Sequence, residues 1–278
     1  MIRRPLRPGP TGGRTGGECR GSGLGYTLPM LDHPISAISF DAGDTLIHCD
    51  PPPAAIYARV LSCYGREVRV REVEPVFSAV RSEMLLHVPP GGDRYSSCGG
   101  EMEWWGAFVQ KLLRRLDHPA PWRPVVDDLY AAFASTAVWR LFPEARDTLV
   151  RLGELGMAMA VTSNWGRKLP DVLRDHGLDS LFRVITVSAR EGVEKPSPEI
   201  FKATLDRLGI QARETVHVGD SPHEDYEGAR QAGLVPVLVD RSGAFANDRY
   251  RRVGDLSELV DLLSSSSQRS ARRMNGGP

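Results

Sequence analysis

Five polar side chains follow short apolar runs of the chain, where the carboxyl end of a strand is expected: Asp41, Ser163, Lys195, Asp220 and Asp225. Parallel strands place their carboxyl ends at one edge of a sheet, where open α/β sheets bind their ligands, so these groups can converge. Carboxylates that meet there repel one another unless a cation lies between them, and oxygen ligands suit Mg²⁺. A metal beside a carboxylate nucleophile indicates phosphoryl transfer through an aspartyl phosphate.

Several of these residues also have a purely structural interpretation. Asp41 lies two positions before Gly43, which suits a tight turn, and Asp often stabilises turns without any catalytic role. Ser163 could cap a following helix, and Lys195 could be a solvated charge in a loop. The combination of these groups, rather than any one residue, favours a catalytic site over a purely structural role.

The elements that must position these residues are strands that alternate with helices. The run before Asp41 is apolar except for small serines, as in a strand buried on both faces. From Trp139 onward, the alternation predicts a parallel sheet with right-handed crossovers, and Ser197 is placed to cap one of the helices. The predicted strands are Ile35–Phe40, Met157–Thr162, Arg183–Val187, Glu214–Val218 and Val235–Val239, and the predicted helices are Pro143–Leu155, Leu169–His176, Pro198–Leu208, Tyr226–Gln231 and Leu256–Leu263.

Residues 51–138 interrupt this alternation with a pattern of helices only. A proline run at Pro51–Pro53 breaks the chain, and Pro75 is well placed at the start of the second helix. We therefore predict one all-helical domain inserted into the sheet domain. Its helices are expected at Ala54–Cys63, at Val76–Leu86, around Trp104 to Leu113 and at Val125–Phe133.

The predicted fold class is α/β, with a Rossmann-like parallel-sheet core formed by residues 35–50 and 139–263 and the all-helical insertion at 51–138. Residues 1–34 and 264–278 contain much Gly, Pro, Ser and Arg, and we expect them to be disordered tails. Met30 is an alternative start of the chain.

The composition favours a cytoplasmic protein with a small-molecule ligand. The 278 residues carry a formal net charge of +0, so we expect no nucleic-acid partner and no membrane partner, and the oligomeric state is left open. The 4 cysteines form no CxxC pair and are interpreted as reduced thiols. No apolar run approaches the roughly 18 residues of a membrane span. No hydrophobic region follows Arg3-Arg4, so we expect no targeting signal.

Four short motifs occur in a fixed order: Asp41-Ala42-Gly43-Asp44-Thr45, Val161-Thr162-Ser163-Asn164, Lys195-Pro196, and Gly219-Asp220 with Asp225. Together they make the chain similar to the haloacid dehalogenase superfamily over roughly residues 35 to 263. The helical insertion resembles the cap domain of that family. The pair Trp104-Trp105 and the run Asp225-Tyr226-Glu227-Gly228-Ala229-Arg230 further resemble hydrolases of its subfamily IA.

The resemblance implies a nucleophile and a metal site. It makes Asp41 the nucleophile that becomes transiently phosphorylated. It also implies that Mg²⁺ is held by a carboxylate oxygen of Asp41, the backbone carbonyl of Gly43, and Asp220, with Asp225 holding the metal or its water shell.

The two remaining site residues are implied to act on the phosphoryl group. Ser163 would bind a phosphoryl oxygen and Lys195 would balance the negative charge, as a point charge against phosphate can. The activity that the resemblance implies is Mg²⁺-dependent phosphohydrolysis of a small-molecule phosphate ester.

One departure from the family pattern concerns the general acid. Most phosphatases of this superfamily have a second Asp two positions after the nucleophile, where this chain has Gly43, and Asp44 stands one place later. Adjacent side chains at a turn point in different directions, so Asp44 is not a simple substitute. General acid-base help is worth on the order of 10²- to 10⁴-fold, so hydrolysis of poor leaving groups is expected to suffer most.

Two other functions remain open at this stage. A 2-haloacid dehalogenase also lacks an acid at the position of Gly43, but such enzymes need no metal, and Asp220 argues against this alternative. A phosphate-binding protein with weak or no turnover is the other alternative, and only the missing acid favours it.

Four further residues are weaker candidates. His48 is close to the nucleophile in sequence, but a solvated loop histidine is the simpler interpretation. Trp104 and Trp105 could line a substrate pocket, although at least one of them is expected in the core of the insertion because neighbours on a helix do not share a face. Lys111 is expected on a helix surface.

Overall fold

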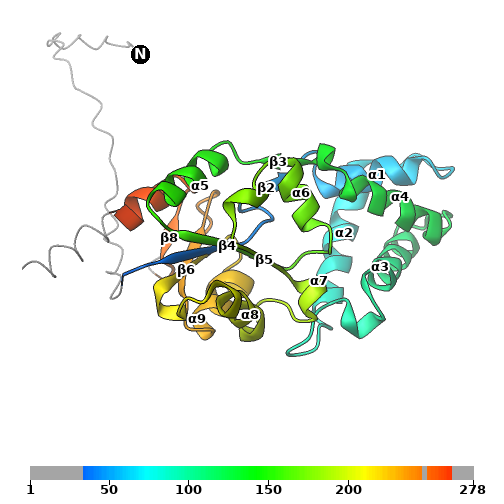
Figure 1. Cartoon of the computed structure of the whole chain (residues 1–278). Coiled ribbons are helices and arrows are strands. Elements are labelled where there is room, and N and C mark those ends of the chain that lie inside the picture. The colour runs from blue at the N-terminus through cyan, green and yellow to red at the C-terminus, as the bar shows by residue number, and fades with distance from the viewer. Residues whose placement is uncertain (1–33, 246–248, 265–278) are drawn as a thin grey trace, which may run out of the picture.

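The computed structural model describes residues 34–245 and 249–264, so the two predicted disordered tails lie almost entirely outside the described residues. A six-stranded sheet with the order β5-β4-β1-β6-β7-β8 forms the centre of the molecule (Figure 1). Every neighbouring pair in it is parallel. This confirms the predicted α/β class with a Rossmann-like sheet. The strands are β1 (Ala37–Phe40), β4 (Ala158–Ser163), β5 (Val184–Val187), β6 (Thr215–Gly219), β7 (Val235–Val239) and β8 (Arg252–Val253).

The two faces of this sheet differ in chemistry because successive side chains of a strand point to opposite faces. Ile38 and Phe40 of β1 belong to the largest apolar cluster, together with residues of β4 and β6. Ser39, between them, is buried beside polar side chains of the neighbouring strands. One face of the central strand is therefore apolar, and the other carries Ser39 and leads to Asp41, which directly follows the strand.

Helices cover both faces of the sheet, α5 and α6 on one side and α8 and α9 on the other (Figure 1). Residues of α5 and α6 join the apolar cluster of the first face, and so do residues of the helical segment 258–264. Their bounds are α5 (Ala145–Glu154), α6 (Leu169–Asp175), α7 (Ser188–Glu191), α8 (Pro198–Leu208) and α9 (Gly228–Gln231), with a π-helical turn at Pro222–Glu227 before α9.

Four helices between β2 and β3 form a separate group beside the sheet (Figure 1). They have their own cluster of buried apolar side chains, which includes Tyr57, Phe108 and Leu112. How the chain divides into domains stays a prediction, and in this article "the cap" means the segment from α1 to α4. The bounds are α1 (Pro53–Ser62), α2 (Val70–Leu85), α3 (Glu101–Arg115) and α4 (Trp122–Ala134).

The antiparallel pair β2 (Ile47–Cys49) and β3 (Trp139–Leu141) connects the cap to the sheet and was not predicted from the sequence. Each strand has only three residues, which is too short for a periodic pattern. The pair holds the segment that enters the cap next to the segment that leaves it. The edge strand β8, with two residues, was not predicted for the same reason.

Two local predictions were wrong. Pro75 does not start α2 but lies inside it, because the helix begins at Val70, where the side chain of Glu72 accepts a hydrogen bond from the backbone N–H of Arg69 at 3.0 Å. Ser197 stands at the N-cap of α8, as predicted, but its side chain makes no capping bond and contacts Glu199 instead. None of the helices within the described residues combines the length and the apolar character that spanning a membrane requires.

We predict opposite effects of one substitution at two helical glycines. A Cβ atom at Gly228 would lie 2.9 Å from the Cα atom of Pro196, so Gly228→Ala should lower the free energy of unfolding by about 1–3 kcal/mol through overpacking. A Cβ at Gly153 would lie 3.7 Å from the Cε atom of Met159, an ordinary van der Waals contact. Gly153→Ala should therefore raise the free energy of unfolding by about 0.5–1 kcal/mol. Urea denaturation measures both, and equal effects at the two positions would contradict this packing.

Candidate active site

The ammonium group of Lys195 is the centre of the site. Its Nζ atom lies 2.6 Å from Oδ1 of Asp41 and 2.5 Å from Oδ1 of Asp225, and the side chain of Lys195 is only 1% exposed. Burial opposes the charge of Lys195, but the two carboxylates outweigh it and raise the pKa of this lysine above its ordinary value. The interpretation of Lys195 as a solvated loop charge is therefore wrong.

A hydrogen-bonded clamp positions the backbone on which Lys195 is carried. Asn164, directly after β4, accepts the backbone N–H of Lys195 at Oδ1 (2.7 Å) and donates from Nδ2 to the backbone carbonyl of Lys195 (2.8 Å). The same Nδ2 also lies 3.0 Å from a carboxylate oxygen of Glu224. One side chain therefore fixes both polar groups of the Lys195 backbone relative to the end of β4.

The cap contributes a second constraint on the same loop. Arg94 forms a buried ion pair with Glu194, with Nε 2.7 Å from Oε2, and its backbone N–H donates to the same oxygen at 3.2 Å. The backbone N–H of Glu194 in turn donates to the carbonyl of Gly92 at 3.1 Å. The segment between α2 and α3 is thus bonded to the residue that directly precedes Lys195.

A hydrogen-bonded column of buried polar side chains on the neighbouring strands ends at Asp225. Nε2 of His217 lies 3.1 Å from Oδ1 of Asp225, and Nδ1 lies 3.1 Å from Oγ of Ser39. The hydroxyl of Ser39 is 2.8 Å from that of Thr162. Burial lowers the pKa of His217, so a neutral imidazole donates to Asp225, and Lys195 together with this bond outweighs burial and holds the pKa of Asp225 well below its usual range.

Three carboxylates converge beside this lysine. Asp41, Asp220 and Asp225 each place one oxygen within 4.8 Å of the others. Burial raises the pKa of Asp41 to about 6, against the opposing effect of Lys195. Burial also raises the pKa of Asp220 to about 8, and the nearby charges of Asp41 and Asp225 add to the effect.

This donor set fits a divalent cation. If all three carboxyl groups were ionised, one ammonium would leave two negative charges without compensation, and this repulsion adds to burial in raising the pKa values of Asp41 and Asp220. A divalent cation would remove the repulsion, and hard oxygen donors are the ligands that Mg²⁺ takes. The predicted metal residues Asp41, Asp220 and Asp225 are thus brought together. For the backbone carbonyl of Gly43 the metal role stays a prediction.

Ser163 and Gly43 border the nucleophile candidate on either side. The hydroxyl of Ser163, the last residue of β4, is close enough to Asp41 to lower the pKa of that carboxyl. Ser163 is not a helix cap, because the next helix begins only at Leu169. A Cβ atom at Gly43 would lie 3.1 Å from the indole ring of Trp165, which therefore covers this position.

The weaker candidates lie elsewhere. Asp44 is exposed and has a left-handed backbone with φ 54, so its side chain does not replace one at Gly43. The ring of His48 packs on Phe142, with centroids 4.8 Å apart. Trp104 is buried in the cap while Trp105 lines a pocket, as the helical spacing of the pair predicts. Lys111 pairs with Glu83 on the helix surface, at 2.7 Å.

Sequence reasoning missed three residues that shape the site. His217 could have been found, because a lone histidine in an otherwise apolar buried strand needs a polar partner. Asn164 was recognised only as part of a motif, and its clamp on Lys195 depends on a contact across 31 positions. The place of Trp165 over Gly43 depends on a loop conformation that leaves no periodic signal in the sequence.

We predict that Asp220→Asn stabilises the protein when metal is removed. In EDTA at pH 8 the substitution removes one of the repelling carboxylates, so the melting temperature should rise, by about 2–4 °C for each kcal/mol gained. Adding Mg²⁺ should raise the melting temperature of the wild type more than that of Asp220→Asn, because binding to the folded state stabilises it. Asp206→Asn, at an exposed position of α8, is the control and should change neither value. A lower melting temperature of Asp220→Asn in EDTA would contradict the repulsion.

Comparison with known proteins shows the family of the chain. Residues 35–233 match the haloacid dehalogenase-like hydrolase family. The chain is 31% identical over 244 residues to haloacid dehalogenase-like hydrolase domain-containing protein 3 of Mus musculus, covering 84% of this chain and 96% of the mouse protein. It is 33% identical over 178 residues to a phosphoserine phosphatase of Thermus thermophilus, covering 60% of this chain and 70% of that enzyme.

A solved structure shares the fold. The magnesium-bound HAD-hydrolase YfnB of Bacillus subtilis superposes with a TM-score of 0.69 at 20% sequence identity, covering 84% of this chain and 100% of that chain. At this identity the likeness concerns the fold alone. The match over residues 35–233 and the identity to the mouse protein go further: the chain belongs to the haloacid dehalogenase-like hydrolase family.

Proposed function

We propose that the protein is a Mg²⁺-dependent phosphohydrolase that acts on a small-molecule phosphate ester through an aspartyl phosphate at Asp41. The observation that carries the proposal is the group of three carboxylates around one buried ammonium, since such a group calls for a cation and presents a nucleophile beside it. The similarity to a phosphoserine phosphatase supports the same reaction class.

The proposed reaction has two steps at phosphorus. An oxygen of Asp41 attacks the phosphorus atom, the bond to the leaving oxygen breaks, and the leaving group departs as an alkoxide or phenoxide. Water then attacks the same phosphorus atom, the bond to Asp41 breaks, and inorganic phosphate is released. Mg²⁺ bound by Asp41, Asp220 and Asp225 would neutralise negative charge on the phosphoryl oxygens.

The other residues of the site orient and balance these groups. Lys195 holds the carboxylate of Asp41 through the 2.6 Å contact and offsets the charge of a bound phosphoryl group. Ser163 donates its hydroxyl to a phosphoryl oxygen. Asn164 and the Arg94–Glu194 ion pair keep the lysine in place by fixing its loop.

A 2-haloacid dehalogenase is the competing hydrolase. The indole of Trp165 over Gly43 is compatible with a dehalogenase, because neither a dehalogenase nor the proposed phosphohydrolase has an acid at the position of Gly43. The position of Asp220 beside Asp41 and Asp225 favours the phosphohydrolase, since burial and the two neighbouring charges oppose ionisation of Asp220 and a metal-independent enzyme gains nothing from a third carboxylate there. Chloride release from 2-chloropropionate in EDTA would support the dehalogenase function instead.

The cellular setting remains part of the proposal. Cys49 and Cys63 are free thiols, which supports a reducing compartment such as the cytoplasm.

Asp41→Asn tests the proposed nucleophile. An amide is a poor nucleophile, so turnover of p-nitrophenyl phosphate with Mg²⁺ should fall by a factor of about 10³ or more, with the fold intact by circular dichroism. The matched control is Asp44→Asn, which changes an exposed carboxylate three residues later and should keep turnover within about threefold. Unchanged turnover of p-nitrophenyl phosphate in Asp41→Asn would contradict the proposal.

The absence of an acid at Gly43 predicts a steep dependence on the leaving group. Aryl phosphates should be hydrolysed about 10²- to 10⁴-fold faster than alkyl phosphates, because alkoxides need protonation far more than phenoxides do. Gly43→Asp alone should not rescue alkyl phosphates, since the indole of Trp165 fills the space of the new side chain. Gly43→Asp combined with Trp165→Ala provides that space and is the informative comparison. Equal rates on aryl and alkyl esters in the wild type would show that another group supplies the proton.

A further inference from the structure

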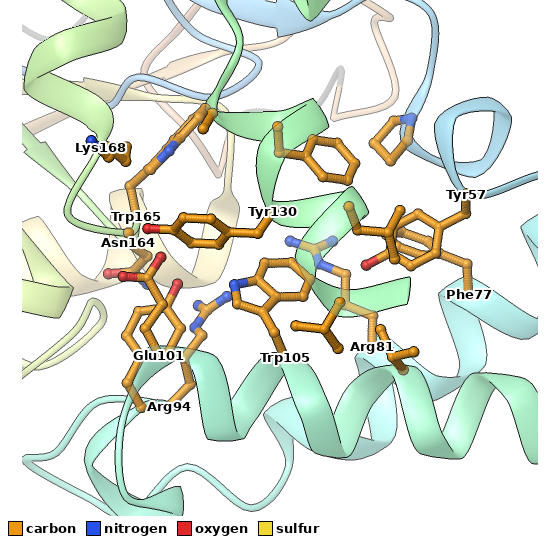
Figure 2. Close-up of a pocket in the computed structure, with 18 of the residues that line it drawn as sticks. Tyr57, Phe77, Arg81, Arg94, Glu101, Trp105, Tyr130, Asn164, Trp165 and Lys168 are labelled. Atoms are coloured by element: carbon orange, nitrogen blue, oxygen red, sulfur yellow. The ribbon is translucent and has the colours of Figure 1, made fainter. Parts of the chain in front are cut away.

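A pocket of about 250 Å³ lies between the cap and the loop that follows β4 (Figure 2). Eight of the residues that line it are aromatic, and they come from the cap as well as from β3 and the loop after β4. Trp165 belongs to this lining, and the same indole covers Gly43 beside the nucleophile candidate. The pocket therefore adjoins the site, although Asp41 itself does not line it.

The size and lining of the pocket suit one flat ring. A cavity of about 150 Å³ in another protein holds benzene, so a volume of about 250 Å³ has room for a single ring with a substituent. Trp105 and Tyr130 project into the pocket from opposite helices, α3 and α4 (Figure 2). Aromatic walls of this kind favour stacking on another ring.

The charged side chains of the pocket are paired, with one exception. Arg94 is bound to Glu194, Lys168 lies 3.4 Å from Asp171, and Glu101 accepts a hydrogen bond from the backbone N–H of Arg167. Among the described residues, no hydrogen bond or ion pair involves Arg81, whose guanidinium Figure 2 shows extending into the pocket from α2. A guanidinium in this position can bind a planar anion such as a carboxylate.

A second polar group in the same part of the pocket lacks a partner. The side chain of Tyr57 is only 1% exposed, and its hydroxyl has no hydrogen-bond partner within the described part of the chain. Figure 2 shows this side chain entering the pocket from α1. A buried hydroxyl without a partner costs free energy that a phenylalanine would avoid, so it points to a hydrogen-bond acceptor supplied by a ligand.

We propose that this pocket holds the leaving group of the substrate, and that this group is an aromatic ring with a carboxylate at the end remote from the phosphate. The inference rests on the proposed phosphohydrolase function and deepens it. The ring lies among the aromatic side chains, and the carboxylate binds Arg81 and the hydroxyl of Tyr57. A phenoxide is also the leaving group that depends least on the acid missing at Gly43, so two separate features favour the same substrate class.

The test compares two esters of equal shape, 4-carboxyphenyl phosphate and 4-carbamoylphenyl phosphate, in the presence of Mg²⁺. The wild type should prefer the carboxylate by about tenfold in kcat/KM, mainly through KM, since the solvent exposure of Arg81 screens the contact. Arg81→Gln should abolish the preference. Arg71→Gln, at an exposed position on the same helix outside the pocket, should retain it.

Tyr57→Phe separates ligand binding from a structural role. It should reduce the preference for the carboxylate without lowering the melting temperature, because the hydroxyl makes no hydrogen bond to any residue that the structure describes. A lower melting temperature with an unchanged preference would assign the hydroxyl to the fold and contradict its place in the site.

Two results separate the failure of this inference from failure of the proposed function. Equal kcat/KM on the two esters, or a preference that survives in Arg81→Gln, overturns the pocket assignment and leaves the phosphohydrolase intact. Hydrolysis of p-nitrophenyl phosphate but of neither ester overturns the pocket assignment alone. If p-nitrophenyl phosphate is not hydrolysed either, the proposed function fails and the pocket is judged by binding of 4-(phosphonomethyl)benzoate, followed through indole fluorescence. Binding that is weakened in Arg81→Gln but not in Arg71→Gln supports the assignment, and no binding or equal binding overturns it.

Discussion

The structure of the site depends on one buried ammonium shared by two carboxylates. Lys195 can stay charged without solvent because Asp41 and Asp225 each lie within 2.6 Å of it, and its charge in turn favours the ionised form of both carboxylates. Breaking a buried pair of this kind by removing one partner usually costs about 3–5 kcal/mol, since the other charge is left uncompensated. The loop geometry around Lys195 is therefore a condition of stability as well as of reactivity.

The polar face of the sheet explains how this arrangement is kept in one protonation state. A carboxylate can only accept, so Nε2 of His217 donates to Asp225 and its Nδ1 accepts from Ser39. The hydroxyls then donate in one direction, from Thr162 to Ser39. The side chains of three parallel strands thus form a hydrogen-bonded column under the site, and the opposite face of the same strands provides the apolar core.

The sequence allowed the sheet and the convergence of the main site residues to be predicted, because both follow from local patterns. Apolar runs with polar residues at their carboxyl ends define parallel strands, and Pro198–Leu208 was predicted with the bounds that the structure has. What could not be predicted depends on long-range contacts or on loop conformation. Periodicity does not indicate the clamp of Asn164 on Lys195 or the indole of Trp165 over Gly43. It also does not indicate that the hydroxyl of Tyr57 lacks a hydrogen-bond partner among the residues the structure describes.

The central claim is that Asp41 carries the phosphoryl group during turnover. The direct measurement is to quench the enzyme in acid during hydrolysis of p-nitrophenyl phosphate, reduce the sample with borohydride and sequence the peptide by mass spectrometry. Hydride converts an aspartyl phosphate to homoserine and leaves a free carboxylate unchanged, so our account predicts homoserine at position 41, only in the presence of substrate and Mg²⁺. Active turnover without any conversion at Asp41, or conversion at another aspartate, would contradict it.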